Sequence, residues 1–249
     1  MEYRSIPVIW ALIELISIIS VVFLWLAIYR GQDIVGNYSF KQMLLYYALV
    51  PLIGSITDVY VTSSLPKMIK DGRISADLLK PYSLSLVHFL KSTSIKLAQQ
   101  ILKVPIFLAF ILFIFFYFQI SLDLKNVAIA LFFSLFAYVL NFLMDLCLSF
   151  AAFWMDEVWS LKHLKFVTQM VFGGMAFPLD ILPKTLKNIF NFQPMRFLYY
   201  FPIKIASSGE SILQITVGFI EVLLWIGFFG ILAAFLWKRG IRKYGAYGN

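Results

Sequence analysis

Long apolar runs constrain this chain more than any other feature. A helix of about 20 apolar residues crosses the hydrocarbon core of a bilayer, and in lipid each backbone polar group must be satisfied within the protein. Hydrophobic residues make up 61% of the chain and charged residues only 14%, against about 25% charged in soluble domains. We therefore predict an all-α integral membrane protein with a single transmembrane domain over residues 1–249. Its six predicted transmembrane helices cover residues 6–29, 42–63, 104–120, 127–153, 166–182 and 215–237.

The distribution of Lys and Arg predicts how these helices are oriented. Of the 21 Lys and Arg residues, fourteen fall on the side that holds both termini and residues 65–103, and seven fall on the other side. Cytoplasmic loops carry the excess of Lys and Arg, so we predict that both termini are cytoplasmic. A net charge of +8 would suggest nucleic acid as the partner of a soluble chain. Here orientation in a lipid membrane explains the charge, and no nucleic-acid partner is expected.

The longest interruption between apolar runs is residues 65–83, LPKMIKDGRISADLLKPYS. Gly72 is predicted to break a first short helix, because glycine adopts the backbone conformation that ends helices. Ser75 is a candidate cap for a second short helix, with Asp77 in its first turn. Pro81 stops this second helix. The pattern predicts two short helical arms that meet at a glycine elbow on the cytoplasmic side.

The side chains of this segment combine an apolar stripe with a ring of cations. The apolar residues are Met68, Ile69, Leu78 and Leu79. The cations are Lys67, Lys70, Arg73 and Lys80. Two interpretations stay open, a docking site for a partner protein and a basic loop that lies on the lipid surface. Capped helices with apolar stripes on the basic side of a membrane protein favour the docking site.

Two further segments interrupt the membrane pattern. Residues 84–103 are amphipathic and predict a helix that begins at the cytoplasmic surface and enters the third span, with a kink near Pro105. Residues 183–214 form an extracellular hydrophobic connection that is broken by Pro183, Pro194 and Pro202. It is too broken to span and too apolar for a free loop, so short re-entrant or interfacial helices are predicted there.

The fifth span carries a Gly173-Gly174 pair, followed by Pro178. These residues suit a helix that ends or bends inside the membrane. Close packing between helices at a pair of small residues is the alternative interpretation, and both stay open.

Catalytic signatures are absent from the sequence. None of the thirteen glycines is followed by Lys, so the chain has no phosphate-binding GxxxxGK[ST] loop, and any ATP is hydrolysed by a partner. A GxSxG nucleophile motif is also absent. His88 and His163 have no second ligand at helical spacing, and Cys147 is the only cysteine, so no metal site is expected. We predict a chain that is not an enzyme and holds no cofactor itself.

Four acidic residues lie within or near predicted spans: Glu14, Asp58, Asp145 and Glu221. A carboxylate in lipid costs several kcal/mol, so each is a functional hypothesis. A proton relay would need them aligned along one path. Hydrogen bonds or ion pairs between helices are the alternative that we favour.

The order of these features resembles the permease subunits of bacterial ABC-type exporters of the type-2 class, in the branch with six spans and no fused ATPase. The motifs that carry the resemblance are FLWLAIYRG at 23–31, GNYSFKQMLLYY at 36–47, IKDGRISADLLKPYS at 69–83, FWMDEVWSL at 153–161 and GGMAFPLDILP at 173–183. The third motif is the most specific, with its I-x-x-G-x-I-x-x-x-L-L-x-P pattern directly after the second span. The resemblance covers essentially the whole chain.

The resemblance implies that residues 65–83 are a coupling helix that docks in a groove of an ABC ATPase subunit. The implied docking residues are Met68, Ile69, Lys70, Asp71, Gly72, Arg73, Ile74, Leu78, Leu79, Lys80 and Pro81. It implies an outer gate at Gly173, Gly174, Pro178, Pro183 and Pro194. Two ATPase copies, which hold ATP and Mg, and a second permease, identical or a sister chain, complete the implied complex in the bacterial cytoplasmic membrane.

One departure from the family pattern concerns the N-terminus. The family usually carries a further cytoplasmic stretch that leads into an interfacial helix, whereas Met1 here lies almost at the first span. Either translation starts earlier than Met1, or the helix is lost and the ATPase contact rests more on residues 65–83.

Two other functions remain as alternatives to the exporter permease. A proton-driven secondary transporter would use the intramembrane acids, and inverted repeats would favour it, but the sequence shows none. A membrane-embedded enzyme that acts on lipid would need a polar catalytic cluster at one interface, and no such cluster stands out. The substrate of transport is not indicated by the sequence.

Overall fold

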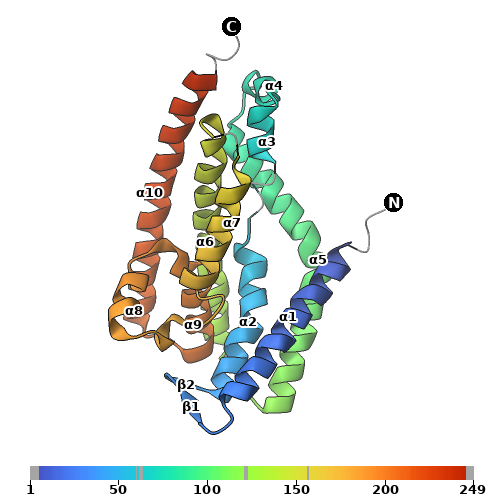
Figure 1. Cartoon of the computed structure of the whole chain (residues 1–249), viewed down its shortest axis with the longest axis vertical. Helices are drawn as coiled ribbons and strands as arrows, with labels where there is room; N and C mark the ends of the chain where they lie inside the picture. Colours follow the sequence, from blue (N-terminus) through green and yellow to red (C-terminus); the bar gives the residue numbers. More distant parts are fainter. Residues whose placement is uncertain (1–5, 60, 62–63, 121–122, 156, 245–249) are drawn as a thin grey trace.

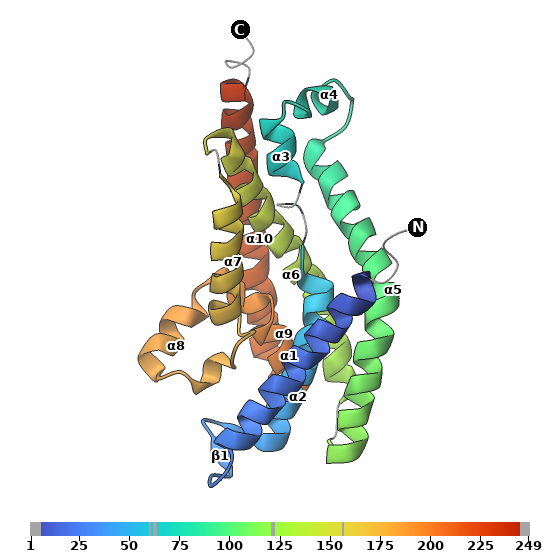
Figure 2. The same ribbon diagram turned by 45° about the vertical axis from the view of Figure 1, so that its right-hand side comes forward.

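The computed structural model describes residues 6–59, 61, 64–120, 123–155 and 157–244. Helices run along the long axis of the molecule (Figure 1), and the described residues contain one small β-ribbon besides them. Two short helices lie at one end, beside the C-terminal end of the last helix, and the β-ribbon lies at the opposite end (Figures 1 and 2). We call these the coupling end and the hairpin end.

The first part of the chain runs from α1 through the hairpin into α2. Its elements are α1 (Ile6–Ile28), β1 (Ile34–Val35), β2 (Tyr38–Ser39) and α2 (Phe40–Thr57). The two strands pair antiparallel around Gly36, whose φ of +62° suits a tight turn. Ser39 and Gln42 then form a reciprocal capping box that starts α2.

Helix α2 ends six residues before its predicted boundary at residue 63, and this prediction is corrected to Thr57. Its last carbonyl groups are bound by side chains of neighbouring helices, as described below, so an end inside the protein leaves no unsatisfied backbone there.

The central part of the chain contains the elbow and the two longest neighbours of α2. Its elements are α3 (Leu65–Lys70), α4 (Ile74–Leu78), α5 (Leu84–Phe118), α6 (Leu124–Phe150) and the 3-10 turn η2 (Ala151–Phe153). The amphipathic stretch and the third predicted span form one continuous α5, whose halves 84–101 and 103–118 meet at 51°. Pro105 lies beside this bend and lacks the N–H that a straight helix would use there.

The last part of the chain alternates short helices and ends in a long one. Its elements are α7 (Trp159–Phe172), η3 (Leu179–Ile181), α8 (Lys184–Asn191), η4 (Pro194–Phe197), α9 (Tyr200–Ser208) and α10 (Ile212–Tyr244). The helix predicted over 166–182 is thus shifted to α7, a correction of both boundaries. At 14 residues α7 is roughly 21 Å long, short of the ~30 Å hydrocarbon core.

Among the described residues, two helices are long and apolar enough to cross a membrane: Leu124–Phe153, which is α6 with η2, and Ile212–Tyr244, which is α10. The bent α5 would be a third if both halves count as one span. The all-α class and the membrane character are therefore confirmed, and the count of six spans stays a prediction.

Two apolar cores hold the elements together. The larger core joins α1, α2, the second half of α5, α6, α9 and α10 toward the hairpin end. The smaller core lies at the coupling end, where α3 packs against η2 and the end of α6, and α10 packs alongside. The elbow is therefore built on a packed base and is not a free loop.

Candidate functional site

The predicted elbow at the coupling end is formed by α3, α4 and the turn between them. Pro66 occupies the first turn of α3, where its missing N–H costs nothing. Gly72 follows α3 with a φ of +74°, in the left-handed region that glycine favours, so the predicted break is confirmed. The predicted cap is wrong, because Arg73 holds the N-cap position of α4 and Ser75 lies inside the helix.

Three apolar side chains anchor the elbow. Leu65, Ile69 and Ile74 are buried and belong to the smaller core, together with Phe150 and Phe153. Ile69 and Ile74 are among the predicted docking residues, and their contact with a partner stays a prediction. Within the chain they hold the elbow on the end of the bundle.

A tyrosine from the end of α10 fixes the elbow from the other side. The hydroxyl of Tyr244 donates to the carbonyl of Gly72 at 2.9 Å, and it lies 2.7 Å from the hydroxyl of Ser75. Its ring packs against Phe153. Tyr244 is a positioning residue that the sequence does not reveal, because 172 positions separate it from Gly72.

The outward face of the elbow is apolar at its tip and charged around it. Leu79 is 89% exposed and Leu78 is 40% exposed, while Met68 is half-buried. The remaining predicted docking residues are all exposed: Lys70, Asp71, Gly72, Arg73, Lys80 and Pro81. An exposed pair of leucines on an anchored base is a shape that suits contact with another protein.

The charges of the elbow are partly paired within it. Arg73 binds Asp71 at 2.8 Å, and Lys80 binds Asp77 at 2.8 Å. The hydrogen bond to Asp77 raises the pKa of Lys80. The pair of Arg73 and Asp71 is solvent-exposed, and Lys80 in the second pair is exposed while Asp77 is half-buried, so both pairs contribute little stability.

The connection from the elbow back to α2 is held by a buried lysine. The ammonium of Lys96, on α5, donates to the carbonyl groups of Ile56 and Asp58, the latter at 2.8 Å. It also lies 4.0 Å from the ring centroid of Tyr138. A cation at the C-terminal end of a helix is favourable because the last carbonyls carry partial negative charge.

Two amides complete this cap of α2. The amide nitrogen of Gln100 donates to the carbonyl of Ser55 at 2.9 Å, and that of Asn141 donates to the carbonyl of Thr57 at 2.7 Å. The end of α2 is therefore tied to α5 and to α6 immediately before the chain turns toward the elbow.

Three of the four predicted intramembrane acids have partners on other elements. Asp145 forms an ion pair with Lys165 at 2.9 Å, and both side chains are buried. Glu221 is paired with Arg196. Asp58 accepts a hydrogen bond from the hydroxyl of Tyr199 at 2.7 Å. The side chain of Glu14 lies outside the described residues.

The predicted outer gate lies where α7 ends. Gly173 ends the helix, and Gly174 follows with a φ of +83°, so the interpretation as a helix end holds. A Cβ atom on Gly174 would lie 2.6 Å from the Cβ of Tyr200 and 2.8 Å from the hydroxyl of Tyr46.

Tyr46 donates to the carbonyl of Gly174 at 2.5 Å, and Tyr47 donates to the carbonyl of Ala176 at 2.5 Å. Adjacent tyrosines of α2 therefore bind this turn.

The three prolines of the predicted gate each start a short helix. Pro178 precedes η3, Pro183 precedes α8, and Pro194 is the first residue of η4. The fixed φ of proline suits the start of a helix, so these residues break the connection into segments. Helix α8 stands away from the bundle in Figure 2, and none of its residues is buried.

Asp180 is a buried centre of this outer region that the sequence analysis missed. Its carboxylate accepts hydrogen bonds from Tyr200 at 2.7 Å, from Tyr38 at 3.1 Å and from Lys187, and Lys204 lies 3.5 Å away. Burial raises the pKa of Asp180, but these hydrogen bonds and positive charges outweigh burial and lower the pKa below its usual value. Burial and the Asp180 charge together raise the pKa of Tyr38 and of Tyr200. One carboxylate therefore joins the hairpin, η3, α8 and α9.

The described residues contain no group of three or more His, Cys, Asp or Glu that could hold a metal ion. The polar contacts described above join the end of α2, the outer region and the long helices to one another.

A search among curated proteins and a search among solved structures gave no match. The profile of a protein family described as ABC-2 family transporter protein matches residues 15–248, nearly the whole chain. The chain therefore belongs to the ABC-2 family of transporter proteins and is a membrane subunit of an ABC transporter.

Proposed function

We propose that this chain is the non-catalytic permease subunit of an ABC exporter and that residues 65–83 couple it to a separate ATPase subunit. The observation that carries the proposal is the elbow itself, an exposed leucine pair on a base that buried side chains and Tyr244 hold in place. Family membership implies an ATPase partner, and the elbow presents exposed Leu78 and Leu79 at the end of the chain where Lys and Arg are in excess.

The proposed arrangement rests on the six predicted spans and on the distribution of Lys and Arg between their connections. Six spans place both termini and the elbow in the cytoplasm and the hairpin and α8 outside the bacterial cytoplasmic membrane. Two copies of the ATPase hold ATP and Mg, and a second permease, identical or a sister chain, forms the other half of the substrate path. The proposed outer gate of the path consists of Gly173, Gly174, Pro178, Pro183 and Pro194.

Movement of the elbow has two routes into the spans. One route runs through the end of α2, which Lys96 ties to α5. The other runs through Tyr244 into α10. Closure of the ATPase pair would push on Leu78 and Leu79, and these contacts would carry the displacement toward the path. The described acids are engaged in pairs between elements, which supports this mechanism over a proton relay.

The test is co-purification of the tagged chain with its chromosomal neighbours, followed by an ATPase assay. The variant Leu78→Asp/Leu79→Asp places charges on the proposed contact and should lower ATPase recovery at least about tenfold. Leu124→Asp is a matched control, because Leu124 is 82% exposed but lies at the start of α6. Undiminished recovery of the ATPase with the double variant, or recovery of no ATPase with the unmodified chain, would refute the assignment.

A further inference from the structure

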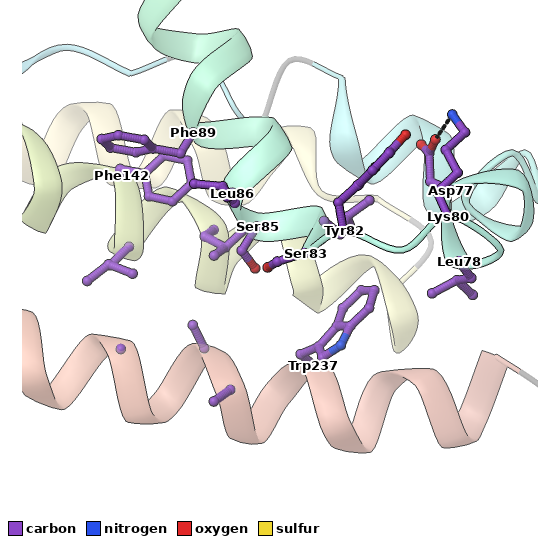
Figure 3. Close-up of a pocket in the computed structure, with 16 residues that line it drawn as sticks. Asp77, Leu78, Lys80, Tyr82, Ser83, Ser85, Leu86, Phe89, Phe142 and Trp237 are labelled. Atoms are coloured by element: carbon purple, nitrogen blue, oxygen red, sulfur yellow. Dashed lines mark hydrogen bonds and ion pairs between the residues drawn. The ribbon is translucent and has the colours of Figure 1, made fainter.

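A groove of about 540 Å³ lies between the elbow, the start of α5 and the pair α6–α10 (Figure 3). This volume falls within the ~300–1,000 Å³ that is typical of ligand sites. Two predicted docking residues, Leu78 and Lys80, line one end of the groove. The proposed transport mechanism does not use the apolar space between α5, α6 and α10, and no feature of the outer gate reaches it.

The groove is apolar where α6 and α10 line it. Its apolar lining comes from three helices: Phe142, Leu143 and Leu146 of α6, Gly230, Ala233 and Ala234 of α10, and Leu84, Leu86 and Phe89 of α5. Both helices are long and apolar enough to cross a membrane. The small residues on α10 leave room, since no atom lies within 4 Å of a Cβ placed on Gly230. The apolar part of the groove therefore follows the two helices that are long enough to cross a membrane.

One end of the groove is polar. Asp77, Lys80, Tyr82, Ser83 and Ser85 line it, and Figure 3 shows Trp237 reaching from α10 toward them. Tyr and Trp are enriched at the level of lipid headgroups, where an apolar ring meets a polar surface. Polarity thus changes along the groove in the same order as along a phospholipid, from acyl chain to headgroup.

The groove also opens onto exposed apolar surface. Leu86 on its rim is 54% exposed, and Ile231 and Phe235, beside the small residues of α10, are 75% and 51% exposed. The polar end carries one cation and one anion, Lys80 and Asp77, which are 2.8 Å apart and whose side chains are 48% and 19% exposed. A zwitterionic headgroup complements this pair, its phosphate toward Lys80 and its amine toward Asp77, whereas an anionic headgroup would meet Asp77 unfavourably.

We propose that this groove binds one zwitterionic phospholipid of the cytoplasmic leaflet, with an acyl chain between α6 and α10 and the headgroup at Asp77 and Lys80. The lipid would bridge the end of the elbow to α10 at a place where protein side chains leave space. The inference goes beyond the transport function and is testable on the purified chain without an ATPase.

The experiment is native mass spectrometry of the full chain in detergent, titrated with palmitoyl-oleoyl phosphatidylethanolamine or with the phosphatidylglycerol of the same chains. The unmodified chain should retain one phosphatidylethanolamine in preference to phosphatidylglycerol. Gly230→Leu should weaken retention about tenfold, because the new side chain fills the groove. Ala234→Phe is a second filling variant, since Ala234 is exposed and lines the groove from the same helix.

Gly227→Leu is the matched control. Gly227 lies on the same helix, a Cβ there also meets no atom within 4 Å, and the residue does not line the groove. This variant should retain lipid like the unmodified chain. Equal retention by both filling variants and the control would overturn the site, and tighter retention of phosphatidylglycerol than of phosphatidylethanolamine would overturn the headgroup assignment.

Discussion

The buried ion pair between Asp145 and Lys165 allows a quantitative test of how the coupling half of the bundle is held together. The two charges are 2.9 Å apart, and their side chains are 3% and 9% exposed. Removing one member of such a buried pair costs about 3–5 kcal/mol, because the other charge stays buried without its ion-pair partner, whereas replacing both by apolar residues is often neutral. For a chain of this size, this cost corresponds to a fall in melting temperature of about 6–20 °C.

The variants are Asp145→Leu, Lys165→Met and the double replacement, measured as thermal stability by size-exclusion chromatography of the detergent-solubilised chain. Each single variant should melt about 6–20 °C below the unmodified chain, and the double variant should recover most of that loss. Asp71→Asn is the control, because the pair Asp71–Arg73 is 42% and 58% exposed and should contribute less than about 1 kcal/mol.

Additivity would refute the reasoning. If the double variant loses the sum of the two single losses to within about 0.5 kcal/mol, the two residues do not interact. Asp145 would then be an independent intramembrane carboxylate, and a role in proton transfer would regain support.

Three further outcomes are expected from the same measurement. Gly174→Ala should cost about 2–4 kcal/mol, because its Cβ meets Tyr200 and Tyr46 at a positive φ, while Gly31→Ala, at φ +99° in open space, should cost only about 1–2 kcal/mol. The pKa of Asp180 is lowered in the folded chain, so its carboxylate contributes fully to the free energy of unfolding at pH values above the unfolded-state pKa of about 3.9. This contribution is lost as the pH falls through the folded-state pKa. The stability difference between the unmodified chain and Asp180→Asn should therefore shrink below about pH 4. Lys96→Met keeps the apolar stem but leaves the end of α2 without its cation, and should cost about 1.5–3 kcal/mol. An unchanged melting temperature in Gly174→Ala or Lys96→Met, or a pH-independent effect of Asp180→Asn, would contradict these assignments.

Local signals in the sequence predict the parts of the fold that depend on neighbouring residues. Apolar runs locate the long helices, Gly72 marks the elbow, and Pro105 marks the bend of α5, because each effect acts within one or two turns of helix. Boundaries fail where distant side chains decide them. The end of α2 at Thr57 depends on hydrogen bonds from Lys96 and Asn141, and no residue near position 57 indicates that these side chains bind there.

The same distinction explains what the sequence reveals of the candidate site. Exposed Leu79 and the charges around it follow from the local pattern, but the burial of Ile69 and Ile74 depends on α6 and η2, which lie far along the chain. Asp180 looks like an isolated acid in an apolar stretch. Its importance appears only when Tyr38, 142 positions away, and Lys187 are brought to it.

Helix α2 is the element through which the two predicted functional regions are connected. Near its start, Tyr46 and Tyr47 bind the turn after α7, and beyond its end Asp58 binds Tyr199. Tyr199 immediately precedes Tyr200, which donates to Asp180 in the outer region. A displacement of the elbow that moves the end of α2 therefore reaches the outer region through hydrogen bonds made by adjacent tyrosines.

Because the same helix carries both sets of contacts, the elbow and the outer gate are expected to move together. A variant that weakens either set of contacts should weaken the coupling between ATP hydrolysis and transport while leaving ATPase docking intact.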